Sequence, residues 1–202
     1  MKYPALRFSP VAEVVRRGAI VLAITAAACT EPANPSESTA APALAAPASA
    51  DLSVGSELGH LRAATAKYHK FEDAKQAGYS VELTPCMADA ALGGMGFHYG
   101  KASAIDATVN TLEPEVLLFE PQKNGKYKLV GVEFIVPYTL RPRSGPAPTA
   151  FGQTFKQNDV FQLWALHAWI WQHNPAGMFA DWNPTVNCSA APAVAGASAH
   201  GH

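Results

Sequence analysis

Two histidines and one glutamate interrupt otherwise apolar segments of this sequence. His98 lies in GGMGFHYG, Glu133 in LVGVEFIVP and His167 in LWALHAWIW. A buried ionised carboxylate without a partner is very costly, so Glu133 is expected to be paired, protonated or bound to a metal. Two imidazoles and a carboxylate with open coordination positions suit zinc, copper or iron. The three residues are therefore a candidate transition-metal site.

Whether the three side chains can meet depends on the strands that carry them. Side chains alternate between the two faces of a strand. The residues expected to share a face with Glu133 are Leu129, Gly131 and Ile135, and those expected opposite are Val130, Val132, Phe134 and Val136. The residues expected beside His167 are Ala165, Trp169 and Trp171. If the strands are neighbours, spaced about 4.8 Å apart, the polar groups come within reach of one metal ion. Gly96 and Gly131 would leave room for a ligand or for a close backbone approach.

Two other interpretations use the same residues without a metal. In a hydrogen-bonded core, His98 donates to Glu133 and His167 donates to a main-chain carbonyl. In an envelope enzyme of unknown substrate, the three side chains act as acid, base and orienting group within an aromatic pocket. None of the three residues belongs to an HxH or HExxH pair, and the sequence contains no GxSxG or Walker motif, so spacing does not choose between these interpretations.

The first 28 residues predict a signal peptide. Residues 1–17 carry four basic residues, and the uncharged run GAIVLAITAAA follows. A basic start, an apolar stretch and small residues before the cleavage point are the features of a secretory signal. The run is shorter than the roughly 20 apolar residues of a membrane span. Residues 29–50, rich in proline, alanine and serine, predict a disordered tether.

The cysteines indicate an oxidising compartment. Three alanines directly before Cys29 resemble a bacterial lipobox, after which Cys29 would carry a lipid. Ordinary cleavage after the same alanines is the alternative. The chain has three cysteines, and setting Cys29 aside leaves Cys86 and Cys188 as an even pair, which predicts a disulfide. We therefore expect an exported lipoprotein of the periplasm or cell envelope.

The remaining chain divides simply. Residues 51–188 predict a single domain by their length, and residues 189–202 are of low complexity and predict a disordered tail. The formal net charge is −1 and no basic block stands out, so nucleic acid is not an expected partner. The expected partners are a membrane, through the lipid anchor, and a small ligand or metal.

The domain is expected to be α+β, an antiparallel sheet with an N-terminal amphipathic helix packed on one face. Apolar residues recur every three or four positions over 56–77, which predicts the helix. EVLLFEP and KYKLVGVEFIVPY flank Asn124-Gly125 and predict a hairpin. Aromatic and branched residues over 162–171 predict another strand, whereas proline and glycine over 141–153 predict a surface loop.

Several short strings resemble an exported bacterial family that is known as a domain of unknown function. They are GGMGFHYG, PEVLLFEP, LVGVEFIVP, LHAWIWQHNPAGMF and WNPTVNC, and they span most of residues 66–188. The resemblance implies a secreted or lipid-anchored single domain. It implies no activity, cofactor or catalytic residue.

Overall fold

The computed structural model describes residues 49–192. The predicted signal peptide, Cys29, nearly all of the predicted tether and residues 193–202 of the predicted tail lie outside this range. Within the described residues, no helix has the length and apolar character needed to cross a membrane.

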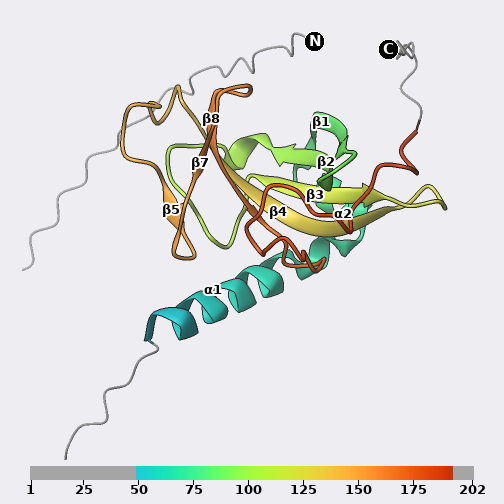
Figure 1. The fold of residues 1–202 in the computed structure, drawn as a ribbon, viewed down its shortest axis with the longest axis horizontal. Helices are drawn as coiled ribbons and strands as arrows, with labels where there is room; N and C mark the ends of the chain where they lie inside the picture. The colour runs from blue at the N-terminus through green and yellow to red at the C-terminus, as the bar shows by residue number, and fades with distance from the viewer. Residues whose placement is uncertain (1–48, 193–202) are drawn as a thin grey trace, which may run out of the picture. The chain divides into compact units, whose positions relative to one another are not determined.

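A curled antiparallel sheet of six strands carries the fold, as predicted (Figure 1). The strand order across it is β1-β2-β3-β4-β8-β7. The strands are β1 (Tyr79–Asp89), β2 (Gly93–Lys101), β3 (Val116–Pro121), β4 (Tyr127–Pro137), β7 (Lys156–Asn158) and β8 (Leu163–Ala168). The segment predicted to be a surface loop contains a short ladder instead, formed by β5 (Thr149–Ala150) and β6 (Gln153–Thr154). The intervening Phe151 is buried in the main core, which explains why this segment is ordered.

The predicted hairpin is confirmed and joins β3 to β4. Gly125 adopts a positive φ of 75° at the turn, a backbone conformation that glycine reaches without a Cβ clash. The predicted strand over 162–171 is shorter in the structure and ends at Ala168. Beyond that residue the Trp169 N–H donates to the carbonyl of Met178, because the chain turns back on itself there.

β1 was not predicted, although it is one of the two longest strands of the sheet, at 11 residues. It contains Pro85, which an edge strand tolerates because one side of its backbone needs no partner. Its register against β2 shifts at four places. Such bulges break the alternation of apolar and polar residues by which a strand is recognised in a sequence.

The predicted helix over 56–77 is correct in place but is divided in the structure. The segments are α1 (Ser49–Thr65), the 3₁₀ turn η1 (Ala66–His69), and α2 (Phe71–Gln76). Lys70 is extended between the last two. The break turns Phe71 onto the rings of Tyr99 and Tyr127, at centroid distances of 4.7 and 4.5 Å. Tertiary packing of this aromatic cluster overrides the local helical pattern.

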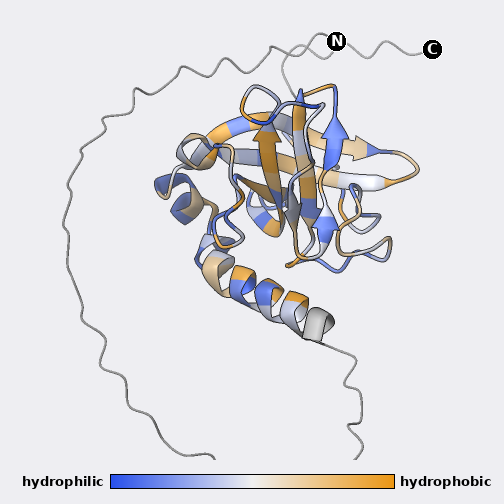
Figure 2. Ribbon diagram, turned by 90° about the vertical axis from the view of Figure 1, so that its left-hand side faces the viewer, coloured by the Kyte–Doolittle hydropathy of each residue, from blue (hydrophilic) through white to orange (hydrophobic). Residues whose placement is uncertain are grey.

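Two buried clusters lie on the two faces of the sheet. The larger contains Leu58 and Leu61 of α1 and Ala74 of α2, together with sheet residues such as Phe134 and Leu166. Figure 2 shows hydrophobic and hydrophilic residues interspersed along α1, and the residues at three- and four-residue spacing, Leu58, Leu61 and Thr65, are buried. The smaller cluster consists of Val116, Leu118, Val130, Ile135, Leu163, Ala165, Trp169 and Val186.

Simple alternation misplaces two residues of β4 and one beyond β8. The β3–β4 register shifts between Leu118 and Phe119, and this bulge exchanges the faces of Leu129 and Val130. Leu129 therefore lies in the larger cluster and Val130 in the smaller. Trp171 packs against the larger cluster, away from the face of His167, because the strand has ended before it.

Candidate metal centre

The side chains of His98, Glu133 and His167 converge on the face of the sheet that carries the smaller cluster. One ligand atom from each residue lies within 4.8 Å of the other two. The residues are 4%, 7% and 5% exposed, so the group is buried. The expected meeting of these three side chains is confirmed.

The strand register explains how the three residues meet. Glu133 of β4 and His167 of β8 are directly opposite each other. His98 lies on β2, opposite Leu118 of β3, which is in turn opposite Gly131 of β4. The condition that the strands be neighbours is met by β4 and β8 but not by β2, because β3 lies between β2 and β4. Strands two apart are separated by roughly 10 Å, and the curl of the sheet and the length of the side chains close this gap.

Both imidazoles direct Nε2 toward the glutamate. Nε2 of His98 lies 3.8 Å from Oε2 of Glu133, and Nε2 of His167 lies 3.7 Å from Oε1. These distances are longer than hydrogen bonds. A tetrahedral ion with ligands at about 2.1 Å holds its ligand atoms about 3.4 Å apart. The two imidazole–carboxylate distances exceed this separation by a few tenths of an ångström, and the three ligand atoms together lie within 4.8 Å, so the group would have to contract to hold an ion.

His98 is oriented by β1. Its Nδ1 lies 2.8 Å from Oγ1 of Thr84, a buried contact. When Nδ1–H donates to this hydroxyl, the lone pair of Nε2 faces Glu133, which is the tautomer that a metal ligand needs. Sequence reasoning missed Thr84 because β1 itself carried no recognisable strand pattern.

His167 is oriented by packing. Within the described residues, both of its ring nitrogens are buried and lack a hydrogen-bond partner. Its ring stacks on the ring of Trp169, at an interplanar angle of 9° and a centroid distance of 6.1 Å. Buried polar atoms are normally satisfied. The two open nitrogens are therefore the feature of this site that most needs an explanation.

The charges around the site leave it neutral near pH 7. Burial, reinforced by Asp181 and Glu115, raises the pKa of Glu133 to about 8. Burial lowers the pKa of His98 to about 3, with the neighbouring His167 acting in the same direction. Burial and the charge of Lys156 lower the pKa of His167 to about 3. Two neutral imidazoles and a carboxyl group that can release its proton are what a divalent cation requires.

The two glycines proposed to make room serve a close backbone approach. A Cβ on Gly131 would lie 2.9 Å from the carbonyl oxygen of Ala168 and 3.3 Å from the ring of Trp169. A Cβ on Gly96 would lie 2.5 Å from the carbonyl oxygen of Phe119. Gly131 therefore lets Trp169 pack close to the sheet beside His167.

Cys86 and Cys188 form the predicted disulfide. It ties β1 to the C-terminal segment. The same segment pairs with β2 through an antiparallel bridge between Gly94 and Asn183. The bond is compatible with an exported protein.

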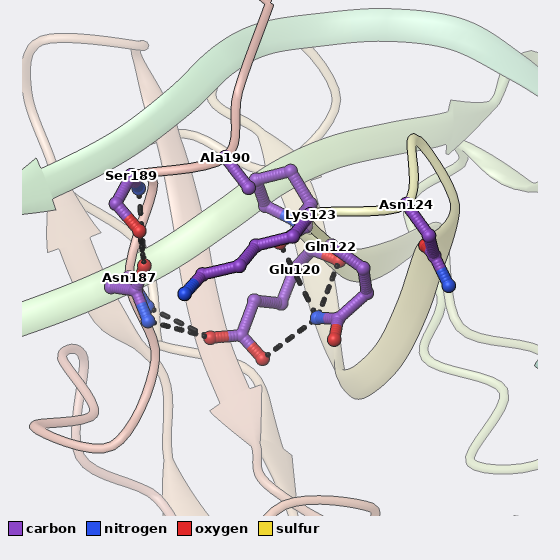
Figure 3. Close-up of a pocket in the computed structure, with 8 residues that line it drawn as sticks. Glu120, Gln122, Lys123, Asn124, Asn187, Ser189 and Ala190 are labelled. Atoms are coloured by element: carbon purple, nitrogen blue, oxygen red, sulfur yellow. Dashed lines mark hydrogen bonds between the residues drawn. The ribbon is translucent and has the colours of Figure 1, made fainter.

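A separate polar pocket of about 440 Å³ lies between the β3–β4 hairpin and this C-terminal segment. Figure 3 shows the Glu120 carboxylate in contact with Asn187 on one side and Gln122 on the other. Sequence reasoning did not predict this pocket, since it joins segments 67 residues apart along the chain.

The trio can hold a divalent ion through three protein ligands and leave further positions for water or another ligand. Comparison with protein-family models, with curated proteins and with solved structures found no match. The resemblance of the short strings to an exported bacterial family remains a prediction.

Proposed function

We propose that this chain is an exported, lipid-anchored binding domain that holds a transition metal through His98, Glu133 and His167. The observation that carries the proposal is the buried convergence of the three ligand atoms within 4.8 Å. Zinc, copper and iron all suit two imidazoles and a carboxylate.

The contacts favour a metal over an internal hydrogen-bond network. A network would bring Nε2 of each histidine to about 2.9 Å from the carboxyl group, whereas the distances are 3.8 and 3.7 Å. Within the described residues His167 also has no hydrogen-bond partner at either nitrogen. A cation placed between the three tips would satisfy both Nε2 atoms and the carboxylate at once.

Metal analysis of the protein made without an affinity tag tests the proposal. We expect about one equivalent of bound transition metal per chain, and its loss when His98, Glu133 and His167 are all replaced by alanine. The matched control replaces His60 and His69, two exposed helix histidines, and should keep the metal. Equal metal content in the triple variant and the wild-type protein would overturn the proposal.

Export and the lipid anchor form the second part of the proposal. They are supported by the signal-like N-terminus, by the alanines before Cys29 and by the Cys86–Cys188 disulfide. The family resemblance of the short strings points the same way. Mass spectrometry of the mature N-terminus is the test, with a diacylglyceryl-modified Cys29 as the expected result. An unmodified Cys29 would overturn the anchor and leave the metal site unaffected.

A further inference from the structure

The two imidazoles use their ring nitrogens in the same way. Each directs Nε2 toward Glu133 and Nδ1 toward a second polar residue. Nδ1 of His98 lies 2.8 Å from Oγ1 of Thr84, within hydrogen-bond range. Nδ1 of His167 lies 3.9 Å from Oδ1 of Asp181, about 1 Å too far. Asp181 thus occupies the place at His167 that Thr84 occupies at His98.

Trp169 fixes the backbone just before Asp181. Its main-chain N–H donates to the carbonyl of Met178 at 2.9 Å, and its indole N–H donates to the carbonyl of Ala180 at 2.6 Å. The same indole ring stacks on the ring of His167. One side chain therefore sets the positions of both the imidazole and the carboxylate beside it.

The backbone just after Asp181 is fixed by β2. Asn183 and Gly94 exchange two main-chain hydrogen bonds, each of 3.0 Å. Asp181 is thereby held at both ends, and only its side chain is free to adjust.

Lys156 holds that side chain in the present arrangement. Nζ of Lys156 lies 2.8 Å from Oδ1 of Asp181, and the two side chains are 55% and 44% exposed. An ion pair between half-exposed groups is weak because water screens it. The carboxylate can therefore move the remaining distance to His167 at little cost.

We propose that Asp181 positions His167 by accepting a hydrogen bond from its Nδ1–H while Nε2 binds the metal. The proposal rests on the metal site proposed above. Histidines that bind metals almost always donate their other ring N–H to a carboxylate, a carbonyl or water, which fixes the tautomer and strengthens the ligand. Asp181 is the acceptor placed to do this for His167, and without it a buried N–H would be left unpaired.

Zinc affinity of the full mature chain, measured by competition with a chelator, tests this role. We expect Asp181→Ala to weaken zinc binding by about 10- to 100-fold. Asp181→Asn should recover part of the loss, because its amide oxygen can still accept the hydrogen bond. Lys156→Gln should bind zinc as tightly as the wild-type protein or more tightly, since it releases the carboxylate.

Asp159→Ala is the matched control. It removes a similarly exposed carboxylate that pairs with Arg143 at 2.7 Å, and it should leave zinc affinity unchanged. A spectroscopic measurement separates positioning from a structural effect. In the zinc-loaded wild-type protein, NMR should show a slowly exchanging His167 Nδ1–H, and this proton should exchange faster in Asp181→Ala.

Two results would overturn this inference alone. The first is wild-type zinc affinity in Asp181→Ala. The second is an equal loss in Lys156→Gln, which would mean that only the ion pair matters. If the folded wild-type protein binds none of zinc, copper and iron, the proposed metal site fails, and the role of Asp181 fails with it.

Discussion

Glu120 and Glu133 are buried glutamates of the same hairpin, each 7% exposed, yet their surroundings differ. The Glu120 carboxylate accepts hydrogen bonds from the backbone and side-chain nitrogens of Asn187, at 3.0 and 3.2 Å, and from Gln122 at 3.3 Å. Glu133 instead faces two imidazole nitrogens at 3.8 and 3.7 Å, beyond hydrogen-bond range.

The difference separates a structural carboxylate from a candidate ligand. A buried carboxylate that is met by N–H donors holds two chain segments together. Glu120 does this for the hairpin and the C-terminal segment. Glu133 has two imidazole nitrogens near its carboxyl group but beyond hydrogen-bond range, and burial raises its pKa to about 8. Burial alone thus identifies neither role, whereas the distance and kind of the nearest nitrogens distinguish them.

The largest expected effect comes from making the same substitution at both glutamates. Glu133→Gln should lower metal affinity by at least about 100-fold, because it removes the anionic ligand. Glu120→Gln should leave metal affinity unchanged but lower the free energy of unfolding by about 1–3 kcal/mol. The reason is that its amide nitrogen would face N–H donors of Asn187 or Gln122. Chelator competition and urea denaturation measure the two quantities.

Either variant can contradict the distinction between Glu120 and Glu133. Loss of metal affinity in Glu120→Gln would show that the polar pocket contributes to binding. Unchanged affinity in Glu133→Gln would remove the glutamate from the site and leave only the two histidines.

The second prediction concerns pH. A group with a raised pKa of about 8 is protonated at neutral pH, so a metal must displace one proton from Glu133. Metal affinity should therefore rise about tenfold per pH unit below pH 7, by about 50-fold in all from pH 6 to pH 8, and level off above that. The histidines add no slope here because their pKa values of about 3 leave them neutral. Isothermal titration calorimetry in buffers of different ionisation enthalpy counts the released proton, and a flat profile would contradict the assignment.

The sequence predicted the three candidate ligands because each is a lone polar residue in an apolar segment. It did not predict their partners. Thr84 lies on a bulged strand without regular alternation, and Asp181 lies in FADWNP, where polar residues are ordinary turn formers. Their roles arise from contacts between segments that are separated along the chain. Thr84 and His98, for example, are 14 positions apart.

The features of the fold also separate into those with a local sequence signal, which were predicted, and those that depend on distant contacts, which were not. The hairpin was predicted from Asn124-Gly125 and its flanks, since that signal is local. The division of the helix at Lys70 was not, because it depends on where Phe71 meets Tyr99 and Tyr127. The Cys86–Cys188 disulfide was predicted from cysteine parity and the expected export, without knowledge of the strand that carries Cys86.

The third prediction concerns Glu115, a buried glutamate that is hydrogen-bonded like Glu120 but has a raised pKa like Glu133. One oxygen accepts a hydrogen bond from the Ile135 N–H at 3.1 Å, yet burial raises its pKa from 4.5 to about 8. Between these values the folded state binds more protons than the unfolded state, so stability falls as pH rises. From pH 6 to pH 7.5 this group should lower the free energy of unfolding by about 2 kcal/mol.

Glu115→Gln should abolish that fall while its amide oxygen still accepts the Ile135 N–H. Urea denaturation of the metal-free protein at the two pH values measures the change. Glu133 contributes in the same direction, so the wild-type protein should show the steepest decline and each single variant a shallower one. An identical decline in Glu115→Gln and the wild-type protein would mean that Glu115 titrates normally.

The smallest expected effect sharpens the difference between a ligand and the residue that orients it. Thr84→Val keeps the shape and strand preference of the side chain but removes the hydroxyl 2.8 Å from Nδ1 of His98. Metal affinity should fall by about tenfold, because the imidazole loses the partner that fixes its tautomer. The pH dependence set by Glu133 should keep its slope, since the ligands themselves are unchanged. Chelator competition at pH 7 and pH 8 measures both, and a loss as large as that of Glu133→Gln would place Thr84 among the residues on which binding itself depends.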